Sequence, residues 1–338
     1  MNPKVSVIVP CRNEEKYIKL CLEAIISNDY GAENIEIIVI DGLSTDDSVR
    51  KIQEVEKEYP LSEIKVISNI RMITPVAFNL GIRESTGTYI LIVGSRHVLS
   101  KDYISTCFRI LSTRSEIACV GSVGELVFDS LKSEMIAYAT SSSFGVGISF
   151  RTQSDVYVDT VGIPFYRRAI FDEIGYFDED LVRNQDDELN YRVRNKGYKI
   201  YITSETSIKY FVRTHFKDLS KQYYQYGYWK VLVNKKHKTV TTIRQVVPSL
   251  FVLYFFIGLI TCVLVKHFVL FYLLSLFIYV FTGIVFSLRK TLKPISIIYI
   301  IRAYFTLHFS YGTGYLNGIL DFLLLNRKPN PNHTSLSR

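Results

Sequence analysis

Short apolar runs alternate with helical patterns over the N-terminal part of the chain. The second run ends in Asp41-Gly42, ahead of an amphipathic helix over 49–59. A further helix begins at Pro75, a residue type that suits the first turn of a helix. Uninterrupted apolar strands between helices are typical of a parallel sheet that is covered on both faces. The predicted strands are 5–10, 35–40, 64–67 and 89–93, with the last of them central.

A much longer apolar stretch covers 246–288 and is interrupted only by Lys266-His267. It predicts two helices of roughly 18–20 residues, each long enough to cross the core of a bilayer. The alternative is a pair of buried core helices, which rarely run so long without a charged face. A third apolar stretch, 295–325, contains Arg302, Asp321 and several glycines. It could therefore cross the membrane, re-enter it or lie along its surface.

Basic residues border the long apolar stretch on both sides, at 235–244 and at 289–293, in a chain with 40 basic and 32 acidic side chains. The positive-inside rule places both flanks, and the region before residue 245, in the cytoplasm of a multi-pass protein of the cytoplasmic membrane. We expect no secretory signal, because the first apolar run is short and ends in Pro10. The five cysteines lack metal or disulfide spacing, which indicates a reducing compartment.

An acidic run, Asp186-Asp187-Glu188, lies between Gln185 and Arg192. A hydrophobic core does not need such a run, whereas a site that deprotonates a hydroxyl beside a nucleotide diphosphate does. The simpler interpretation is a solvated turn at the N-terminus of a helix. The chain has no GxGxxG or GxxxxGKS pattern, which disfavours dinucleotide-binding and P-loop folds. A carboxylate that ends a parallel strand, such as Asp41, instead points to the ligand crevice of an open α/β sheet.

The ordered set of these motifs resembles glycosyltransferase family 2, whose members have the GT-A fold. The resemblance covers 4–230 and rests on Pro10, Asn13-Glu14, Asp41-Gly42-x-Ser44-x-Asp46, Asn79-x-Gly81 and Gln185-Asp186-Asp187-Glu188-Leu189-x-x-Arg192. Membrane-bound enzymes of the succinoglycan exopolysaccharide type are the most similar subgroup, on account of Val158-Asp159-Thr160-Val161, 183–192, 222–230 and His308-Phe309-Ser310-Tyr311-Gly312. The implied fold class is α/β: a GT-A open, mostly parallel sheet with flanking helices, followed by a C-terminal helical membrane region.

The resemblance implies an inverting transfer of a sugar from a nucleotide-diphosphate donor to an acceptor hydroxyl. One carboxylate must take the acceptor proton, and a cationic group must hold the departing diphosphate. The family pattern gives the first role to Asp186, with Asp187 in reserve. Taken singly, residues such as Asp41 could simply close a turn, but their joint order favours a donor pocket. The residues expected to bind the donor are Pro10, Arg12, Glu14, Asp41, Arg71, Asn79, Ser95 and Arg96.

The chain departs from the family after the fourth predicted strand. Most members have Asp-x-Asp there, or Asp-Ala-His in the most similar subgroup, and hold a divalent cation under the diphosphate. This chain has Ser95-Arg96-His97 instead. In one interpretation His97 still ligates Mg²⁺ or Mn²⁺, although a single imidazole serves either ion poorly. In the other, Arg96 takes the place of the cation and offers a planar, permanently charged fork to the phosphates.

An aromatic segment over 222–230 contains the single tryptophan of the chain. In processive members of the family a Gln-x-x-Arg-Trp segment contacts the acceptor, and the partial similarity here suggests an enzyme that adds one sugar. The alternative is a helix that rests on the membrane surface with tyrosines at the headgroups. The residues expected to contact the acceptor or a lipid-linked phosphate are Arg213, Gln222, Trp229 and Lys230.

The predicted organisation is a GT-A catalytic domain (1–215), an interfacial helical connector (216–245), transmembrane or interfacial helices (246–325) and a polar tail (326–338). The resemblance implies a UDP-hexose donor, a polyprenyl-diphosphate-linked saccharide as acceptor, the membrane as a further partner, and no nucleic acid. The product would belong to exopolysaccharide, capsule or cell-envelope glycan synthesis. The alternative is a catalytically decayed subunit that binds a sugar nucleotide or acts as a scaffold. The intact acidic run argues against this alternative.

Overall fold

The computed structural model describes residues 2–146, 155–212, 215–240 and 243–329, and the chain divides into two compact units. The first comprises Met1–Val127 and Phe150–Phe211, and the second comprises Phe128–Ser149 and Val212–Arg338. The sequence predicts a catalytic domain that includes 128–149. In the structure this segment belongs with the C-terminal helices, because its helix α5 (Leu131–Ser141) packs its buried residues against them.

The first unit is built on a mixed sheet with the strand order β3-β2-β1-β4-β8-β6-β9-β5, and β7 pairs with β9 at one side. Its strands are β1 (Val5–Cys11), β2 (Ile35–Asp41), β3 (Glu63–Ser68), β4 (Tyr89–Ile92), β5 (His97–Leu99), β6 (Ile117–Val127), β7 (Val156–Tyr157), β8 (Phe165–Arg167) and β9 (Lys199–Phe211). The first four are parallel, as predicted, and β4 is central and buried. The rest of the sheet is less regular, because β8 runs antiparallel to both of its neighbours.

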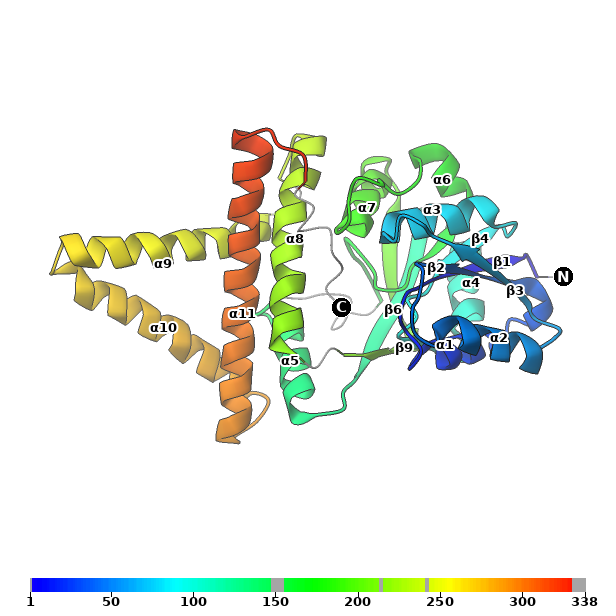
Figure 1. Cartoon of the computed structure of the whole chain (residues 1–338), viewed down its shortest axis with the longest axis horizontal. Helices are drawn as coiled ribbons and strands as arrows, with labels where there is room; N and C mark the ends of the chain where they lie inside the picture. The colour runs from blue at the N-terminus through cyan, green and yellow to red at the C-terminus, as the bar shows by residue number, and fades with distance from the viewer. Residues whose placement is uncertain (1, 147–154, 213–214, 241–242, 330–338) are drawn as a thin grey trace. The chain divides into compact units, whose positions relative to one another are not determined.

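Helices cover both faces of this sheet (Figure 1). Alternate positions of β1 and β2 face two separate cores, in keeping with the two-residue period of a strand. One core is closed by α1 (Ile18–Ile26), α2 (Ser48–Glu58) and α4 (Tyr103–Thr113), and the other by α3 (Thr74–Glu84), α6 (Ala169–Ile174) and α7 (Gln185–Asn195). A short 3₁₀ turn, η1 (Ala32–Asn34), leads into β2. Burial of both faces explains why the predicted strands read as unbroken apolar runs.

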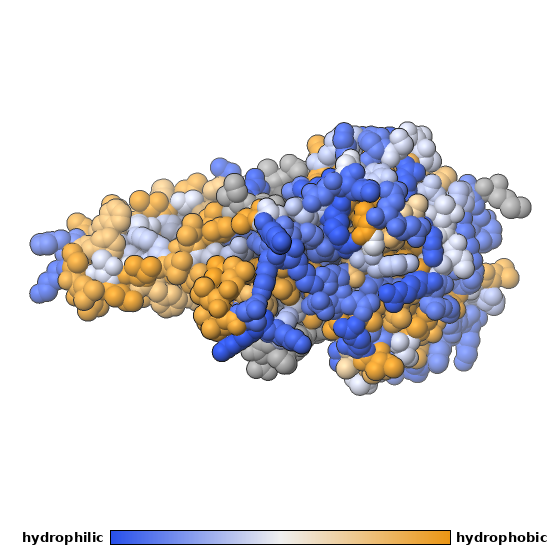
Figure 2. All heavy atoms as spheres, turned by 90° about the horizontal axis from the view of Figure 1, so that it is seen from above, coloured by the Kyte–Doolittle hydropathy of each residue, from blue (hydrophilic) through white to orange (hydrophobic). Residues whose placement is uncertain are grey.

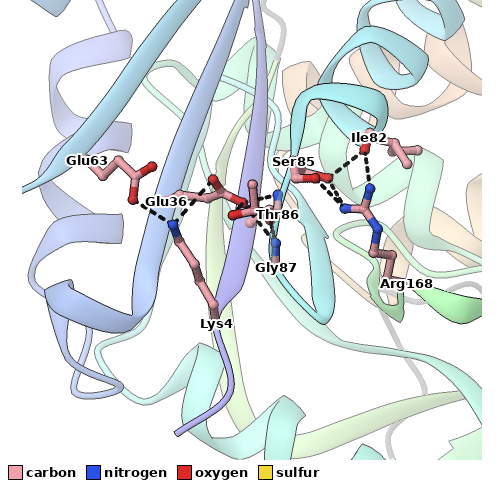
Figure 3. Close-up of polar contacts among 9 residues, drawn as sticks. Lys4, Glu36, Glu63, Ile82, Ser85, Thr86, Gly87 and Arg168 are labelled. Atoms are coloured by element: carbon pink, nitrogen blue, oxygen red, sulfur yellow. Dashed lines mark hydrogen bonds and ion pairs between the residues drawn. The ribbon is translucent and has the colours of Figure 1, made fainter. Parts of the chain in front are cut away.

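A buried carboxylate organises the amino end of the parallel strands (Figure 3). Glu36 accepts hydrogen bonds from the Ser6 hydroxyl, from the Thr86 amide at 2.5 Å and from the Gly87 amide at 3.0 Å. Lys4 lies 3.6 Å from the same carboxylate. Burial alone would raise the pKa of Glu36, but the hydrogen bonds that it accepts outweigh burial and hold its pKa below the usual value. This end of the sheet is therefore closed by donors from the protein itself.

The second unit consists mainly of long helices: α8 (Phe216–His237), α9 (Val247–Leu264), α10 (Phe268–Leu288) and α11 (Pro294–Gly318), with a short 3₁₀ turn η2 (Ile243–Gln245) and a π-helical turn η3 (Ile319–Leu324). Glycines let α8 and α11 approach closely. A Cβ on Gly314 would lie 2.0 Å from the Tyr224 carbonyl oxygen, and one on Gly227 would lie 2.1 Å from that of Tyr311. Gly314, one of the glycines of the third apolar stretch, thus serves helix packing.

The phenyl ring of Phe144 anchors the segment after α5 between α10 and α11. It lies 4.9 Å from the ring of Tyr304 and 5.5 Å from that of Tyr279. His308 bridges the same elements, since its Nε2 lies 2.8 Å from the Phe144 carbonyl oxygen and its Nδ1 lies 2.8 Å from the Tyr279 hydroxyl. The described residues that follow α5, up to 146, are thus held by contacts with α10 and α11, and 147–154 lie outside the described residues.

Two helices, α9 and α10, are long and apolar enough to cross a membrane, with a mean hydropathy of 2.4 each. They are separated at Lys266-His267, where the sequence predicts the break. Apolar side chains cover much of their outer surface (Figure 2), and only 17% and 11% of the two spans is buried within the protein. Such exposure disfavours the alternative of buried core helices. The third stretch forms α11, which buries one face against α8, α9 and α5.

Candidate active site

The loops that follow β1, β2 and β4 meet at the carboxyl end of the parallel strands. The Ser95 hydroxyl donates a hydrogen bond to the Pro10 carbonyl oxygen at 2.6 Å. The Gly42 amide donates one to the Cys11 carbonyl oxygen at 2.7 Å. These contacts join the carboxyl ends of β1, β2 and β4, which carry most of the predicted donor-binding residues, as expected for parallel strands whose ends share one edge.

Asp41 ends β2 and is 6% exposed. Its carboxylate accepts hydrogen bonds from the Ser44 amide at 3.1 Å and from the Ser44 hydroxyl at 2.6 Å. The turn that the sequence offered as the simpler interpretation is therefore present, and it fixes the carboxylate at this edge. Arg12 lies over the same turn, because a Cβ on Gly42 would be 3.2 Å from its Cδ atom.

Arg96 and Glu14 form an ion pair at the same edge. The Nε of Arg96 lies 2.8 and 3.1 Å from the two carboxylate oxygens of Glu14, which is 5% exposed. The guanidinium also lies over the ring of Tyr17, with its Cζ 5.3 Å from the ring centroid. A buried carboxylate needs such a partner, because an unpaired charge of this kind is costly.

The side chains at this edge fit a divalent cation poorly. Mg²⁺ and Mn²⁺ favour several carboxylate, carbonyl or water oxygens, yet the Glu14 carboxylate is bound by a guanidinium and the Ser95 hydroxyl by a carbonyl group. The Nδ1 of His97 lies 2.9 Å from the Gly94 carbonyl oxygen, and its ring stacks on Tyr210. Across the described ranges no three His, Cys, Asp or Glu side chains gather as a metal site would require. The role of His97 as a ligand stays a prediction.

Arg71 and Asn79 are brought together through Glu179, a residue that sequence reasoning missed. Arg71 forms an ion pair with the Glu179 carboxylate at 2.6 Å, and the Asn79 amide nitrogen donates to it at 2.9 Å. Asn79 also exchanges two hydrogen bonds with the backbone of Phe177. Asn79 thus holds the loop before α7, and its predicted contact with the donor remains untested.

The acidic run forms the first turn of α7, which begins at Gln185 after Asn184 in the left-handed conformation. Asp186 is exposed and Asp187 is half-buried. Both carboxylates lie in the first turn, where the partial positive charge of the helix N-terminus attracts anions, and Asp186 lies at the surface, where an acceptor hydroxyl can reach it. The interpretation as a helix cap and the interpretation as a catalytic base are therefore compatible.

Buried contacts fix the inner face of α7. Glu188 is paired with Arg192, whose Nη2 lies 2.8 Å from its carboxylate. The same guanidinium donates to the carbonyl oxygens of Ile174, Gly175 and Tyr176. Asn190 donates to the Thr160 hydroxyl at 2.9 Å. Glu188 and Arg192 thus support the first turn of α7, and Asp186 lies at the surface.

The predicted acceptor-side residues lie on α8 in the second unit. The Gln222 side chain donates to the Tyr226 hydroxyl at 2.8 Å. Trp229 is 1% exposed and Lys230 is 6% exposed, so both are packed within the unit. Arg213 lies outside the described residues. Burial of the tryptophan indicates a packing role, while the predicted acceptor contacts of these residues remain untested.

Sequence reasoning missed Tyr17 and Glu179, which position Arg96, Arg71 and Asn79. Glu179 lies in a second acidic run, Asp178-Glu179-Asp180, which offered a signal. No sequence pattern marks Tyr17, because its contact with Arg96 forms only when β1 and β4 are neighbours.

Comparison with known proteins identifies the family. The model of glycosyl transferase family 2 matches residues 6–175. One sequence relative is the dolichyl N-acetyl-α-D-glucosaminyl phosphate 3-β-D-2,3-diacetamido-2,3-dideoxy-β-D-glucuronosyltransferase of Methanococcus voltae. It is 31% identical to this chain over 238 residues, which cover 69% of this chain and 74% of that protein. The chain belongs to glycosyltransferase family 2. Its members transfer a sugar from a nucleotide-sugar donor.

Another relative of this family 2 chain is the succinoglycan biosynthesis protein ExoA of Rhizobium meliloti, 25% identical over 72% of this chain and 73% of that protein. Among solved structures, the mannosyltransferase PcManGT of Pyrobaculum calidifontis, in complex with GDP-Man and Mn²⁺, aligns with a TM-score of 0.55 and 16% identity over 70% of this chain and 64% of that one. TarS 1-349 of S. aureus aligns with a TM-score of 0.52 and 18% identity over 93% and 90% of the two chains. These structures confirm the predicted GT-A fold.

Proposed function

We propose that the chain is an inverting glycosyltransferase that moves a sugar, in the first instance a hexose from UDP, to a saccharide carried on a polyprenyl diphosphate. The exposed Asp186 on a firmly held α7 is the observation that carries the proposal. In the transfer, the acceptor oxygen bonds to the anomeric carbon while the bond from that carbon to the diphosphate oxygen breaks. The acceptor proton passes to the Asp186 carboxylate, and the nucleotide diphosphate leaves with the bonding electrons.

The donor site in this proposal is the carboxyl edge of the parallel strands. Asp41 and Arg12 lie on one turn there, and Ser95 ties the loop after β4 to the end of β1. The loops after β1, β2 and β3 each hold a non-glycine residue at positive φ: Asn13 at 53°, Leu43 at 58° and Met72 at 56°. Such conformations cost energy and gather at binding sites. They support a preformed pocket at this edge.

A lipid-linked acceptor is supported by two independent features. The Methanococcus voltae relative is named for action on a dolichyl-linked sugar phosphate, and α9 and α10 expose apolar surface over lengths that suit a bilayer. An enzyme and an acceptor that share one membrane meet in two dimensions, which raises their effective concentration without any new contact. The basic flanks of the helices put the catalytic unit on the cytoplasmic side in this proposal.

Nucleotide release by the purified full chain tests the proposed reaction. The donors are UDP-, GDP- and dTDP-sugars, with and without a polyprenyl-diphosphate-linked saccharide. Release that depends on the acceptor supports transfer, and the active donor identifies the nucleotide and the sugar. If no donor gives release under any condition, the chain acts as a sugar-nucleotide-binding or scaffolding subunit instead.

Cysteine labelling tests the membrane topology. In a Cys262→Ser background, His267→Cys lies between α9 and α10, and Thr291→Cys lies between α10 and α11. A membrane-impermeant maleimide added to intact bacterial cells should label the first variant and spare the second. Labelling of Thr291→Cys alone would reverse the proposed orientation, and labelling of both in intact cells would contradict a membrane-spanning pair.

A further inference from the structure

The guanidinium of Arg96 is bound differently from those of Arg192 and Arg168, two other half-buried arginines of the first unit. Arg192 uses its Nε, Nη1 and Nη2 in hydrogen bonds to protein oxygens. Arg168 is bound through Nη1 to Ser85 and through Nη2 to the Ile82 carbonyl oxygen. Arg96 is bound to Glu14 through Nε alone, and its Nη1 and Nη2 have no hydrogen-bond partner in the described part of the chain. Its side chain is 30% exposed.

Two contacts hold Arg96 in this orientation. The Glu14 carboxylate accepts hydrogen bonds from the Nε of Arg96, and the ring of Tyr17 lies against the face of the guanidinium. Glu14 is placed in turn by the hydrogen bond from its amide to the Ser48 hydroxyl at 2.7 Å. The terminal amino groups are therefore presented by a fixed side chain, so that less conformational entropy is lost when they bind an anion.

We infer that Arg96, held by Glu14 and Tyr17, binds the diphosphate of the donor directly and takes the place of a divalent cation. This inference rests on the proposed transferase function. In this arrangement the positive guanidinium lies between two negative groups, the buried Glu14 carboxylate and the diphosphate. A metal ion held between a carboxylate and a diphosphate would give the same order of charges. A guanidinium with two free amino groups can donate parallel, charge-assisted hydrogen bonds to phosphate oxygens. The charge that develops on the leaving diphosphate is stabilised by the same contact.

The inference accounts for the poor fit of this edge to Mg²⁺ or Mn²⁺. A metal ion beside Arg96 would compete with the guanidinium for Glu14, and the two cations would repel each other. It also gives the Ser95-Arg96-His97 sequence a function: Ser95 ties its loop to the end of β1, and Arg96 supplies the charge.

Nucleotide binding by the solubilised full chain is the test. UDP, GDP and dTDP are titrated calorimetrically in chelator, and again with Mg²⁺ or Mn²⁺. We expect the affinity in chelator to lie within about twofold of that with metal, and Arg96→Met to lower it about 10- to 100-fold in both buffers, the loss expected for hydrogen bonds to a charged group. Arg96→Lys keeps the positive charge but lacks the planar pair of amino groups. Its nucleotide affinity should therefore lie between that of the unchanged protein and that of Arg96→Met.

Two further variants serve as controls for this binding test. Arg109→Met removes an exposed arginine that pairs with Glu205 on the same unit, and should leave affinity unchanged. Glu14→Gln combined with Arg96→Met removes both charges of the ion pair and should still lose affinity. A requirement for metal, or unchanged affinity in Arg96→Met, would overturn the inference while leaving the transferase intact. Absence of binding by all three nucleotides in every buffer would overturn the proposed function as well.

Discussion

The two ends of strand β2 show how a buried carboxylate can serve different purposes. At the amino end, Glu36 is surrounded by the Ser6 hydroxyl and the amides of Thr86 and Gly87 (Figure 3). At the carboxyl end, the Asp41 side chain accepts hydrogen bonds from a single residue of the described ranges, Ser44. The first carboxylate joins three strands, and the second fixes a loop at an edge of the sheet. The protein thus closes one end of its sheet and builds a site at the other.

The arginines at the two ends differ in the same way. Arg168 at the amino end donates hydrogen bonds from its terminal nitrogens to Ser85 and Ile82. The terminal nitrogens of Arg96 have no hydrogen-bond partner among the described residues. A guanidinium whose two terminal nitrogens bind the protein stabilises the fold, and one that is held through Nε alone can bind an anion. The comparison predicts that changes at the amino end alter stability, while changes at the carboxyl end and on α7 alter activity or affinity.

The largest effect is expected for the proposed base. Asp186→Asn should lower turnover by about 10²- to 10⁴-fold, the contribution usual for general base catalysis, and should leave nucleotide affinity unchanged. Acceptor-dependent nucleotide release and calorimetric titration measure the two quantities. Asp187→Asn is the matched variant on the same helical turn. A larger loss of turnover for Asp187→Asn than for Asp186→Asn would identify Asp187 as the base instead.

Glycine substitutions test the difference in packing. A Cβ on Gly87 would lie 2.7 Å from the Ser6 amide nitrogen and 2.8 Å from the Lys4 carbonyl oxygen, both of them backbone atoms. Gly87→Ala should therefore cost about 3 kcal/mol, towards the upper end for overpacking. A Cβ on Gly42 would lie 3.2 Å from Cδ and 3.3 Å from Cβ of Arg12, looser contacts than those at Gly87, so Gly42→Ala should cost under about 1 kcal/mol. Chemical denaturation in detergent measures both, and equal losses would remove this contrast between the two ends.

Arg168 provides the counterpart to Arg96. Arg168→Met should lower the free energy of unfolding by about 2 kcal/mol, because the carbonyl groups of Ser85 and Ile82 lose a charged donor. The nucleotide affinity of the folded protein should not change. Denaturation and calorimetry on one preparation give both values, and a fall in affinity without a fall in stability would show that the comparison is wrong.

The smallest effect depends on pH. Glu36→Gln should cost about 1–2 kcal/mol near neutral pH, because the amides that bind the carboxylate lose a charged acceptor. The pKa of Glu36 is lower in the folded protein than its usual value. Its stabilising contribution is therefore complete above the unfolded-state pKa of about 4.3 and disappears as the pH falls through the folded-state pKa. Thermal melts of both proteins should converge at acid pH, and a gap that is constant with pH would exclude this explanation.

Local pattern was sufficient for much of the fold. The apolar runs predicted β1 to β4 and the two membrane-length helices, including the break at Lys266-His267. The irregular half of the sheet was not predicted, since β8 is a three-residue strand that is defined by its neighbours. The place of 128–149 with the C-terminal helices also depends on distant contacts, such as that of Phe144 with Tyr304.

The sequence by itself determined the family, the parallel strands, the acidic run on α7 and the two apolar helices, because each is encoded in residues that are close together in the chain. Only the tertiary structure decided how the individual charges are used. Glu36, at the start of β2, and Glu14, in the loop after β1, are both buried, yet the first binds backbone amides and the second binds the Nε of an arginine. That difference arises when strands and loops far apart in sequence meet, because hydrogen bonds depend on distances that the linear order of residues does not contain.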